Sequence, residues 1–294
     1  MEILKNAEFE AKCAEMAKRN NYNLYDIVFI DKDGKAYHYQ HVPANRSNNC
    51  YSATKMFVMT AIGFLWAEGK LKLEDKVCDY LRKYIKTDYD PNWEKVTIAH
   101  ALGHSMGIDC GYLDIDVEDC GEDHITEAFK KNLAYEPGTT RVYSDAAYYI
   151  LTRVATEACG EPLDNYLSSR LFRPLKFQEI AMTKCPYGYV VGGTGIYCPT
   201  ADMAKLGSVY LNNGIFEGQR IISEDWVKLV EEKEYGLDRC EARSFGKTGA
   251  HGQMIAYCKE TNKVVAFHAY QCGNYDFRGE AIREFCDSDY TLCK

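Results

Sequence analysis

A serine and a lysine three residues apart, Ser52 and Lys55, are the residues whose types and spacing point most directly to chemistry. The run from Ser52 to Glu68 is mostly apolar and lacks proline, and Gly69 follows it, which predicts a buried helix. Residues three apart share one helix face, so the hydroxyl and the amine would meet in the first turn. Because desolvation helps a lysine to release its proton, the pair predicts an activated serine. In the alternative interpretation, Ser52 only caps the helix and Lys55 is a solvated first-turn residue.

Two later stretches strengthen this interpretation. Tyr143-Ser144-Asp145 stands at a predicted helix start after the Pro137-Gly138 turn, and Lys247-Thr248-Gly249 lies on a predicted strand. Each tripeptide alone is a weak signal. In this order, Ser-x-x-Lys, Tyr-Ser-Asp and Lys-Thr-Gly resemble the three-part signature of the penicillin-recognising serine hydrolases.

The resemblance is greatest to the branch that contains class C β-lactamases, D-alanyl-D-alanine peptidases and esterases, and it runs from about residue 25 to 270. Further stretches are similar to the family motifs GxLxLxDxV, LLTHTSGL, PG…YSN, PLGM and GGL…DMA. They are, in that order, Leu71–Val77, Leu102–Ile108, Glu136–Asp145, Phe172–Leu175 and Gly192–Met203.

The resemblance implies catalytic roles for four residues. Ser52 would attack a carbonyl and form an acyl-enzyme, and Lys55 would ease removal of its proton. Tyr143 would shuttle protons as base and as acid to the leaving group. Lys247 would supply the positive charge that lowers the pKa of Tyr143.

The resemblance also implies groups that hold the substrate. The backbone N–H groups of Ser52 and Ala250 would form an oxyanion hole. Thr248 and the strand around it would hold a carboxylate or an amide edge of the substrate. The substrate-binding residues are expected to be Asp145, Thr248, Gly249 and His251, although His251 is open to a second interpretation as a simple turn residue.

Asp145 departs from the family pattern, because this branch often has asparagine there. A carboxylate at this position could pair with Lys55 or with Lys247 and hold either amine protonated, which would weaken a lysine base. Glu161 superficially resembles a deacylating glutamate of the class A type. It falls at a predicted helix start after Gly160, so a capping role is expected instead.

Two rival signals are weaker. Ser244 and Lys247 form a second Ser-x-x-Lys, but residues three apart on a strand point to opposite faces and would not meet. His100 and His104 have a spacing that can bind zinc on a helix, yet Gly103 and the missing glutamate argue against a metal site. His104 is instead expected to support the site region.

The elements that must position these residues divide into strands at both ends of the chain and helices between them. A hairpin is expected at 27–41, with a turn at Asp31–Lys35, and three strands are expected from Ser244 to Tyr270. This pattern predicts an α/β protein of the α+β type, with an antiparallel sheet built from both termini and flanked by helices. We expect one catalytic domain over 1–294, with an α/β lobe at about 1–50 and 190–294 and a mostly helical lobe at about 51–189. An exposed acidic loop is expected at 109–123, and such loops would set specificity.

Composition limits the partners. The formal net charge is −8, so neither nucleic acid nor an anionic membrane surface is an expected partner. The 13 cysteines include no C-x-x-C pair, which disfavours a zinc ribbon or redox motif, and their odd number disfavours a disulfide framework. The first residues lack the apolar region of a secretory signal, and no apolar run is long enough to span a membrane. These features indicate a cytoplasmic protein, and leave its oligomeric state open.

Together these observations predict a serine hydrolase without cofactor or metal. It would cleave an ester, amide, D-amino-acid peptide or β-lactam carbonyl in a small molecule or peptide, with esterase or peptidase activity favoured over antibiotic resistance. The alternative is a non-catalytic module on the same fold that binds a peptide or an acyl ligand.

Overall fold

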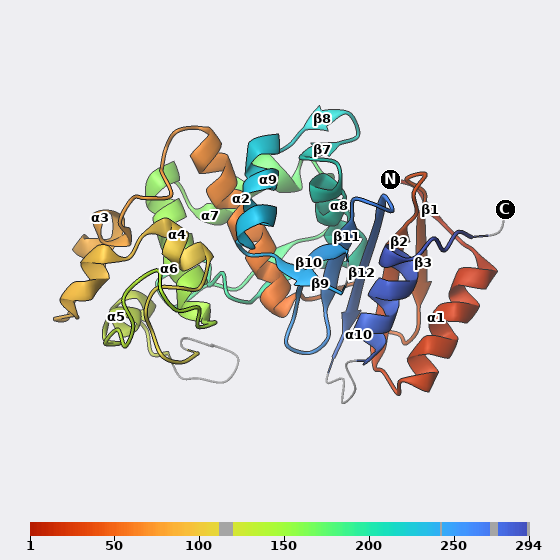
Figure 1. Ribbon diagram of the computed structural model, residues 1–294, viewed down its shortest axis with the longest axis horizontal. Coiled ribbons are helices and arrows are strands. Elements are labelled where there is room, and N and C mark those ends of the chain that lie inside the picture. The colour runs from red at the N-terminus through yellow and green to blue at the C-terminus, as the bar shows by residue number, and fades with distance from the viewer. Residues whose placement is uncertain (112–119, 242, 271–275, 293–294) are drawn as a thin grey trace. The chain divides into compact units, whose positions relative to one another are not determined.

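The computed structural model describes residues 1–111, 120–241, 243–270 and 276–292, and the chain divides into two compact units (Figure 1). The first unit contains Met1–Ala53, Pro174–Ala181 and Tyr197–Lys294. The second unit contains Thr54–Arg173 and Met182–Ile196. Residues 174–181 belong to the first unit because Lys176 and Gln178 bond there to Lys205 and Asp202. That the whole chain forms one catalytic domain stays a prediction.

The first unit is built on a seven-stranded sheet in the order β1-β3-β2-β12-β11-β10-β9. The strands from the N-terminal part are β1 Ile3–Leu4, β2 Leu24–Ile30 and β3 Ala36–Gln40. Those from the C-terminal part are β9 Asp238–Cys240, β10 Ser244–Thr248, β11 Met254–Cys258 and β12 Lys263–Ala269. Antiparallel pairing of β2 with β12 joins the two ends of the chain, as the sequence predicts.

The hairpin of β2 and β3 forms because its turn is specified locally. The Asp31 carboxylate accepts hydrogen bonds from the backbone N–H groups of Asp33 and Lys35. Gly34 adopts the left-handed backbone conformation, with φ of 77°, that glycine tolerates at no steric cost. The predicted hairpin is therefore confirmed.

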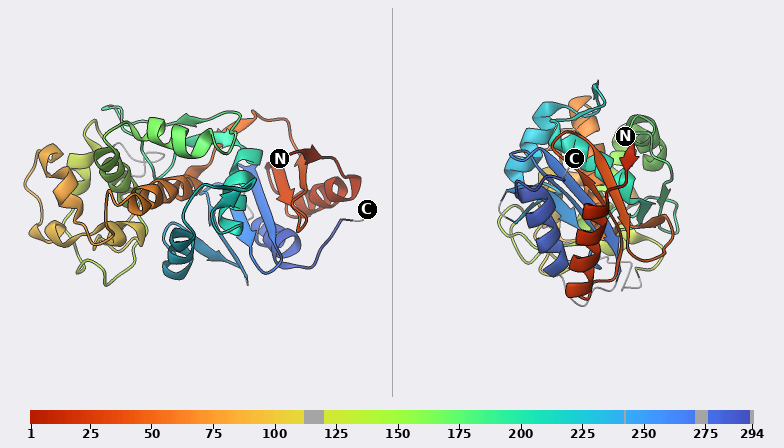
Figure 2. Two further views of the ribbon diagram at one scale, coloured as in Figure 1. Left: turned by 90° about the horizontal axis from the view of Figure 1, so that it is seen from above. Right: turned by 90° about the vertical axis from the view of Figure 1, so that its right-hand side faces the viewer.

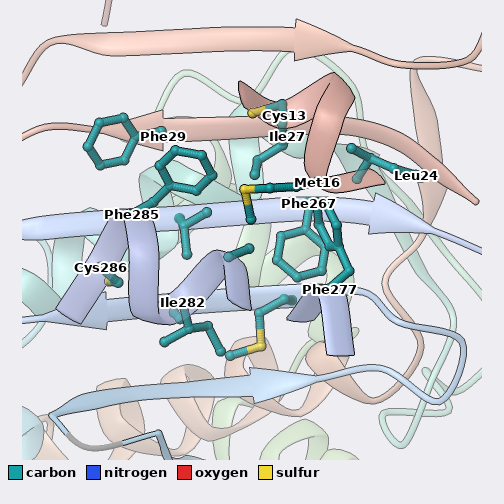
Figure 3. Packing of buried hydrophobic residues seen from close by; sticks show 14 of the residues in the cluster. Cys13, Met16, Leu24, Ile27, Phe29, Phe267, Phe277, Ile282, Phe285 and Cys286 are labelled. Atoms are coloured by element: carbon teal, nitrogen blue, oxygen red, sulfur yellow. The ribbon is translucent and has the colours of Figure 1, made fainter. Parts of the chain in front are cut away.

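One face of the sheet is covered by α1 Ala7–Arg19, α10 Asp276–Ala281 and the π-helical turn η5 Ile282–Asp287. The right-hand view of Figure 2 shows α1 and the C-terminal helical segment side by side on this face. Figure 3 shows the apolar side chains between them, among them Phe29, Phe267 and Phe285, which are fully buried. Phe9 of α1 meets Phe285 edge to face, with ring centroids 5.2 Å apart.

The other face is covered by α8 Thr200–Leu211, which packs on β2, β11 and β12. A Cβ at Gly207 would lie 2.8 Å from a methyl carbon of Val264, so glycine permits this close approach. Because β11 and β12 are covered on both faces, every residue in them is buried, and their sequences are nearly continuous apolar runs. The unit also contains β4 Ser47–Asn49, the 3₁₀ turn η1 Tyr51–Ala53, all but the first residue of β6 Ile196–Pro199, β7 Ile215–Phe216, β8 Gln219–Arg220 and α9 Glu224–Lys233.

The second unit is helical and is organised around α6 Asp145–Cys159, in which Asp145 to Ala155 are all buried. Helices α2 Thr54–Ala67, α3 Val77–Leu81, α4 Ile98–Leu102, α5 His124–Phe129 and α7 Leu163–Leu167 all pack on it. The Ser144 hydroxyl accepts from the N–H of Ala146 and caps the start of α6, and Gly160 ends the helix with φ of 76°. Short turns η2 Arg82–Tyr84, η3 Pro91–Lys95 and η4 Ser168–Phe172 connect the helices, and β5 Ala181–Met182 lies where the chain passes between units.

Three details differ from the expected elements. Strand β1 pairs in parallel with β3, so the sheet is mixed rather than wholly antiparallel. Strand β9 was not predicted, because three residues, Asp238–Cys240, carry too little alternation to be recognised. Ser52 lies in the 3₁₀ turn η1 before α2 and not inside the α-helix, because the turn closes at Cys50, whose carbonyl accepts from Ala53.

Two further expectations concern the acidic loop and segments long enough to span a membrane. Residues 112–119 of the predicted acidic loop lie outside the described residues. Among the helices that the structure describes, none is both long enough and apolar enough to cross a bilayer. The most apolar one, α2, has 14 residues, and its buried residues run from Thr54 to Leu65.

Candidate active site

In the first unit, Ser52 sits in a tight turn whose backbone is constrained. The side chain of Asn49 accepts a hydrogen bond from the N–H of Tyr51, and the carbonyl of Cys50 accepts one from Ala53. Tyr51 has φ of 46°, in the left-handed region that costs energy for residues other than glycine. Strained backbone of this kind concentrates at functional sites, which marks the turn around Ser52 as a candidate.

The Lys-Thr-Gly stretch lies beside this turn within the same unit. Lys247 and Thr248 end β10, and the N–H of Gly249 donates to the carbonyl of Gln253 to close the following turn. A Cβ at Gly249 would lie 2.8 Å from the carbonyl oxygen of Cys50, so only glycine lets the end of β10 approach the chain segment before Ser52. Ala250 is exposed in this turn. The structure therefore brings Ser52, Gly249 and Ala250 into one region of the first unit.

His251 continues this turn and belongs to an aromatic group. Its ring centroid lies 4.6 Å from that of Tyr51 and 4.8 Å from that of Tyr270. The rings of Tyr51 and Tyr270 are stacked at 6.3 Å. We call Tyr51, His251 and Tyr270 the aromatic trio. Its member Tyr51 directly precedes the predicted nucleophile in the chain, and the sequence offered no signal for Tyr51 or Tyr270.

Lys247 is buried, and its ammonium is already paired within the first unit. Its Nζ lies 2.8 Å from Oδ2 of Asp238, on the neighbouring strand β9. Burial, and secondarily the charge of Asp238, raises the pKa of the adjacent Cys240 thiol to about 12. Cys240 therefore stays protonated near neutral pH and is not a nucleophile. The partner of Lys247 could not be predicted, because strand β9 was not.

In the second unit, Lys55 is fully buried at the start of α2. Its Nζ donates to Oδ1 of Asp145 at 2.5 Å and to the carbonyl oxygen of Gly193 at 2.7 Å. Lys55, one of the two partners proposed for Asp145 on sequence grounds, is thus in contact with it. A carboxylate and a carbonyl beside the amine both favour its protonated form, whereas burial opposes it.

Gly193 is needed for this contact. A Cβ at this position would lie 2.7 Å from Cβ and Cγ of Asp145, so a side chain here would displace the carboxylate. Gly192 has φ of 79°, and a Cβ there would lie 2.3 Å from a methyl carbon of Thr152. The glycine-rich turn at 192–195 therefore serves to bring a carbonyl close to Lys55 and Asp145.

Tyr143 precedes α6 and is held from one side by His104. The ring centroids of Tyr143 and His104 are 4.5 Å apart, and Nδ1 of His104 accepts a hydrogen bond from the N–H of Ser144 at 3.3 Å. The carbonyl of His104 accepts another from Val142, so both neighbours of Tyr143 in the chain are fixed. The Nζ of Lys55 lies 4.7 Å from the centre of the Tyr143 ring. The phenol is 43% exposed, so it is fixed yet accessible.

The residues of the two rival signals make structural contacts instead. The Ser244 hydroxyl donates to Asp287, whereas Lys247 pairs with Asp238, so this second Ser-x-x-Lys does not form a pair. Nδ1 of His100 accepts from the N–H of Thr97 in a capping box. Burial, followed by the charge of Lys76, lowers the pKa of His100 and keeps its ring neutral. His104 lies under Tyr143, as the support role predicts.

This chain is similar to known proteins in its sequence and in its fold. A family model described as Beta-lactamase matches residues 28–283. The protein named "Putative D-alanyl-D-alanine carboxypeptidase" of Escherichia coli (strain K12) is 26% identical over 247 residues, covering 63% of this chain and 56% of that protein. The chain spans about half the length of the curated relatives it matches.

Solved structures show the same fold at low identity. A penicillin binding protein from Bacillus halodurans has a TM-score of 0.74 at 17% identity, covering 95% of this chain and 99% of that one. A D-stereospecific amidohydrolase from Streptomyces sp. has a TM-score of 0.72 at 17% identity, with the same coverage of 95% and 99%. Because the family model matches most of the length of this chain, the chain belongs to the β-lactamase family of hydrolases.

Proposed function

We propose that this chain is a serine hydrolase that forms an acyl-enzyme on Ser52 with ester, amide or D-amino-acid peptide carbonyls. The observation that carries the proposal is the setting of Lys55, three residues after Ser52. Its amine is removed from water and fixed by Asp145 at 2.5 Å and Gly193 at 2.7 Å. A fully buried lysine is costly to keep, and such groups concentrate at functional sites.

The proposed roles refine those expected from the sequence. Ser52 Oγ attacks the carbonyl carbon, and its proton passes to Tyr143 Oη. Tyr143 then gives this proton to the leaving group as the old bond to the carbonyl carbon breaks. In the second half of the reaction, water attacks the acyl-enzyme and gives a proton to Tyr143. The ester bond to Ser52 then breaks, Ser52 Oγ takes the proton back, and the carboxylic acid is released. We assign Lys55 to act as a cation that favours the phenolate of Tyr143 rather than as the base, because its amine donates to both the Asp145 carboxylate and the Gly193 carbonyl.

The turn at 249–251 is assigned to the developing oxyanion. In this assignment the N–H groups of Ser52 and Ala250 donate to the carbonyl oxygen as it gains negative charge. The close approach that Gly249 permits beside Cys50 supports this role, because it draws the two backbone segments together. Thr248, Gly249 and His251 border the same region, and we assign them to substrate binding.

The names of related proteins guide the choice of substrate. One relative is named a D-alanyl-D-alanine carboxypeptidase and one structural neighbour a D-stereospecific amidohydrolase. The first name describes a peptidase and the second an amide hydrolase, and neither name mentions a β-lactam. We therefore propose an ester or peptide substrate ahead of a β-lactam.

The test is covalent labelling of the whole chain. The protein is incubated separately with a fluorophosphonate and a fluorescent penicillin, and intact mass and peptide mapping locate any adduct. We expect an adduct on Ser52 with at least the fluorophosphonate, and turnover of 4-nitrophenyl acetate that Ser52→Ala abolishes. A matched control is Ser244→Ala, which removes the serine of the second Ser-x-x-Lys and should keep both adduct and turnover.

Labelling and turnover together decide between the two hypotheses from the sequence. A folded protein that shows no adduct with either reagent and no ester turnover would be a ligand-binding module and not an enzyme. Turnover of the nitrophenyl ester without turnover of a chromogenic cephalosporin would favour the esterase or peptidase branch.

A further inference from the structure

We propose that Asp238 determines the substrate class of this enzyme, because its ion pair with Lys247 makes the site select uncharged acyl substrates over those that carry a carboxylate. The inference rests on the proposed function and deepens it. It also decides between the two ligands, a carboxylate or an amide edge, that the Lys-Thr-Gly stretch was expected to hold.

The first step is the position of the ion pair. Asp238 lies on the edge strand β9, where it is the register partner of Gly246 on β10, next to Lys247. Its Oδ2 lies 2.8 Å from Nζ of Lys247. Lys247 in turn lies two residues before Gly249, whose close approach to Cys50 brings this strand end beside Ser52. A carboxylate is thus built into the part of the first unit that would receive the substrate.

The second step is electrostatic. The side chain of Lys247 is only 3% exposed, whereas that of Asp238 is 36% exposed. A buried ammonium cannot swing away to meet an incoming anion, so a substrate carboxylate would have to share it with Asp238. Two carboxylates at one cation repel each other, and salt screens a repulsion over so short a distance only in part. An uncharged carbonyl or amide of the substrate is not repelled by Asp238, so Lys247 can donate to it without this cost.

The third step is the chemistry of the neighbouring surface. In the aromatic trio, Tyr51 and His251 are the chain neighbours of Ser52 and Ala250, and Tyr270 contacts both of their rings, with ring centroids between 4.6 and 6.3 Å apart. Tyrosine rings favour stacking with apolar and aromatic groups. This surface and the neutralised lysine both favour a substrate whose acyl group is uncharged, and aromatic acyl groups in particular.

The experiment compares substrates that differ by one charge. The pairs are mono-4-nitrophenyl succinate with 4-nitrophenyl succinamate, and 3-acetoxybenzoate with 3-acetoxybenzamide, which place the carboxylate on the acyl side and on the leaving-group side. We expect the unaltered protein to have a higher kcat/KM for the neutral member of at least one pair. Asp238→Asn should raise kcat/KM for the matching anionic member about tenfold, mainly through KM, and change the neutral member little.

Controls separate selectivity from support of the fold. Asp287→Asn removes another carboxylate that contacts β10, through Ser244, and should leave the anionic-to-neutral ratio unchanged. Equal losses for both members in Asp238→Asn would make Asp238 a structural residue and overturn the proposal. If Asp238→Asn does not fold, the unaltered protein still tests the idea: tighter inhibition by 3-carboxyphenylboronic acid than by 3-carbamoylphenylboronic acid would overturn it.

The failure of this inference differs from that of the proposed function. If Ser52→Ala keeps the ester turnover, the proposed nucleophile is wrong whatever the ratio is. If Ser52→Ala abolishes turnover and the unaltered protein prefers the anionic member of both pairs, the enzyme stands and the role of Asp238 does not.

Discussion

Each of the two units contains one lysine of the predicted site, and each lysine is buried against an aspartate. In the second unit, the side chains of Lys55 and Asp145 are 0% and 10% exposed, and a backbone carbonyl from Gly193 completes the contact. In the first unit, Lys247 is 3% exposed but Asp238 is 36% exposed. The same ion pair is therefore sealed in one unit and open to solvent in the other.

Two ion pairs of the same residue types can therefore serve two different tasks. A sealed pair holds its charge in a fixed position, and breaking it leaves an uncompensated charge in the interior. A pair with one solvated member loses less when it is broken, since water replaces the lost partner. We therefore assign Lys55–Asp145 to the fixed electrostatics of catalysis and Lys247–Asp238 to substrate choice.

The largest effect is expected from breaking the sealed pair. Lys55→Met should lower kcat for ester hydrolysis by about 10²- to 10⁴-fold and the free energy of unfolding by about 3–5 kcal/mol, since Asp145 would stay buried without its cation. Steady-state ester hydrolysis measures the change in kcat, and urea denaturation measures the change in the free energy of unfolding. The double variant Lys55→Met with Asp145→Asn should recover much of the stability and none of the turnover. Wild-type turnover in that double variant would exclude Lys55 from catalysis.

A third buried pair provides a matched control for stability. Lys205 donates to Asp202 at 2.6 Å and to the carbonyl of Lys176 at 2.6 Å, which reproduces the amine, carboxylate and carbonyl around Lys55. Lys205→Met should cost about 3–5 kcal/mol of unfolding free energy and leave kcat unchanged in the folded fraction. Denaturation and active-site titration with the fluorophosphonate test this. A loss of kcat as large as that of Lys55→Met would mean that buried pairs affect turnover only through the fold.

A buried side chain that has a carbonyl partner instead of a carboxylate should respond to pH in its own way. His268 is fully buried on β12, its Nε2 lies 2.9 Å from the carbonyl oxygen of Cys198, and burial lowers its pKa. Below about pH 6.5, His268 binds a proton in the unfolded chain but stays neutral in the folded chain. The free energy of unfolding therefore falls as pH falls. The contribution is at most about 1.4 kcal/mol per pH unit. Unfolding between pH 7 and 5 should show a shallower slope in His268→Gln, and an unchanged slope would contradict the assignment.

The smallest effect on stability is expected at the open pair. Asp238→Asn should cost about 1 kcal/mol of unfolding free energy or less, because the carboxylate is partly solvated and asparagine still accepts a hydrogen bond. Asp145→Asn, measured by the same urea titration, should cost more. Equal losses at the two positions would remove the contrast between a sealed and an open pair.

Much of the fold could be predicted because its determinants are local. The β2–β3 hairpin follows from Asp31 and Gly34, and the late strands β10, β11 and β12 follow from apolar runs broken by turns. The sequence correctly predicts that Ser52 lies at the start of a buried helical segment, although Ser52 lies in a 3₁₀ turn rather than in the first α-helical turn. Strand β9 could not be predicted, because three residues gain their structure only from pairing with β10.

Residue types and their spacing were enough to select the candidates for chemistry. Ser52, Lys55, Tyr143 and Lys247 stand in an order and a spacing that resemble one family, and the match of that family over residues 28–283 agrees with it. Which aspartate each lysine contacts depends on tertiary packing. Lys55 and Asp145 are 90 residues apart in sequence and Lys55 and Gly193 are 138 apart, so packing of helices and of the glycine-rich turn within the second unit brings them together. Asp238 reaches Lys247 through strand pairing, and its exposure, which separates the two ion pairs, follows from its place on an edge strand and not from its residue type.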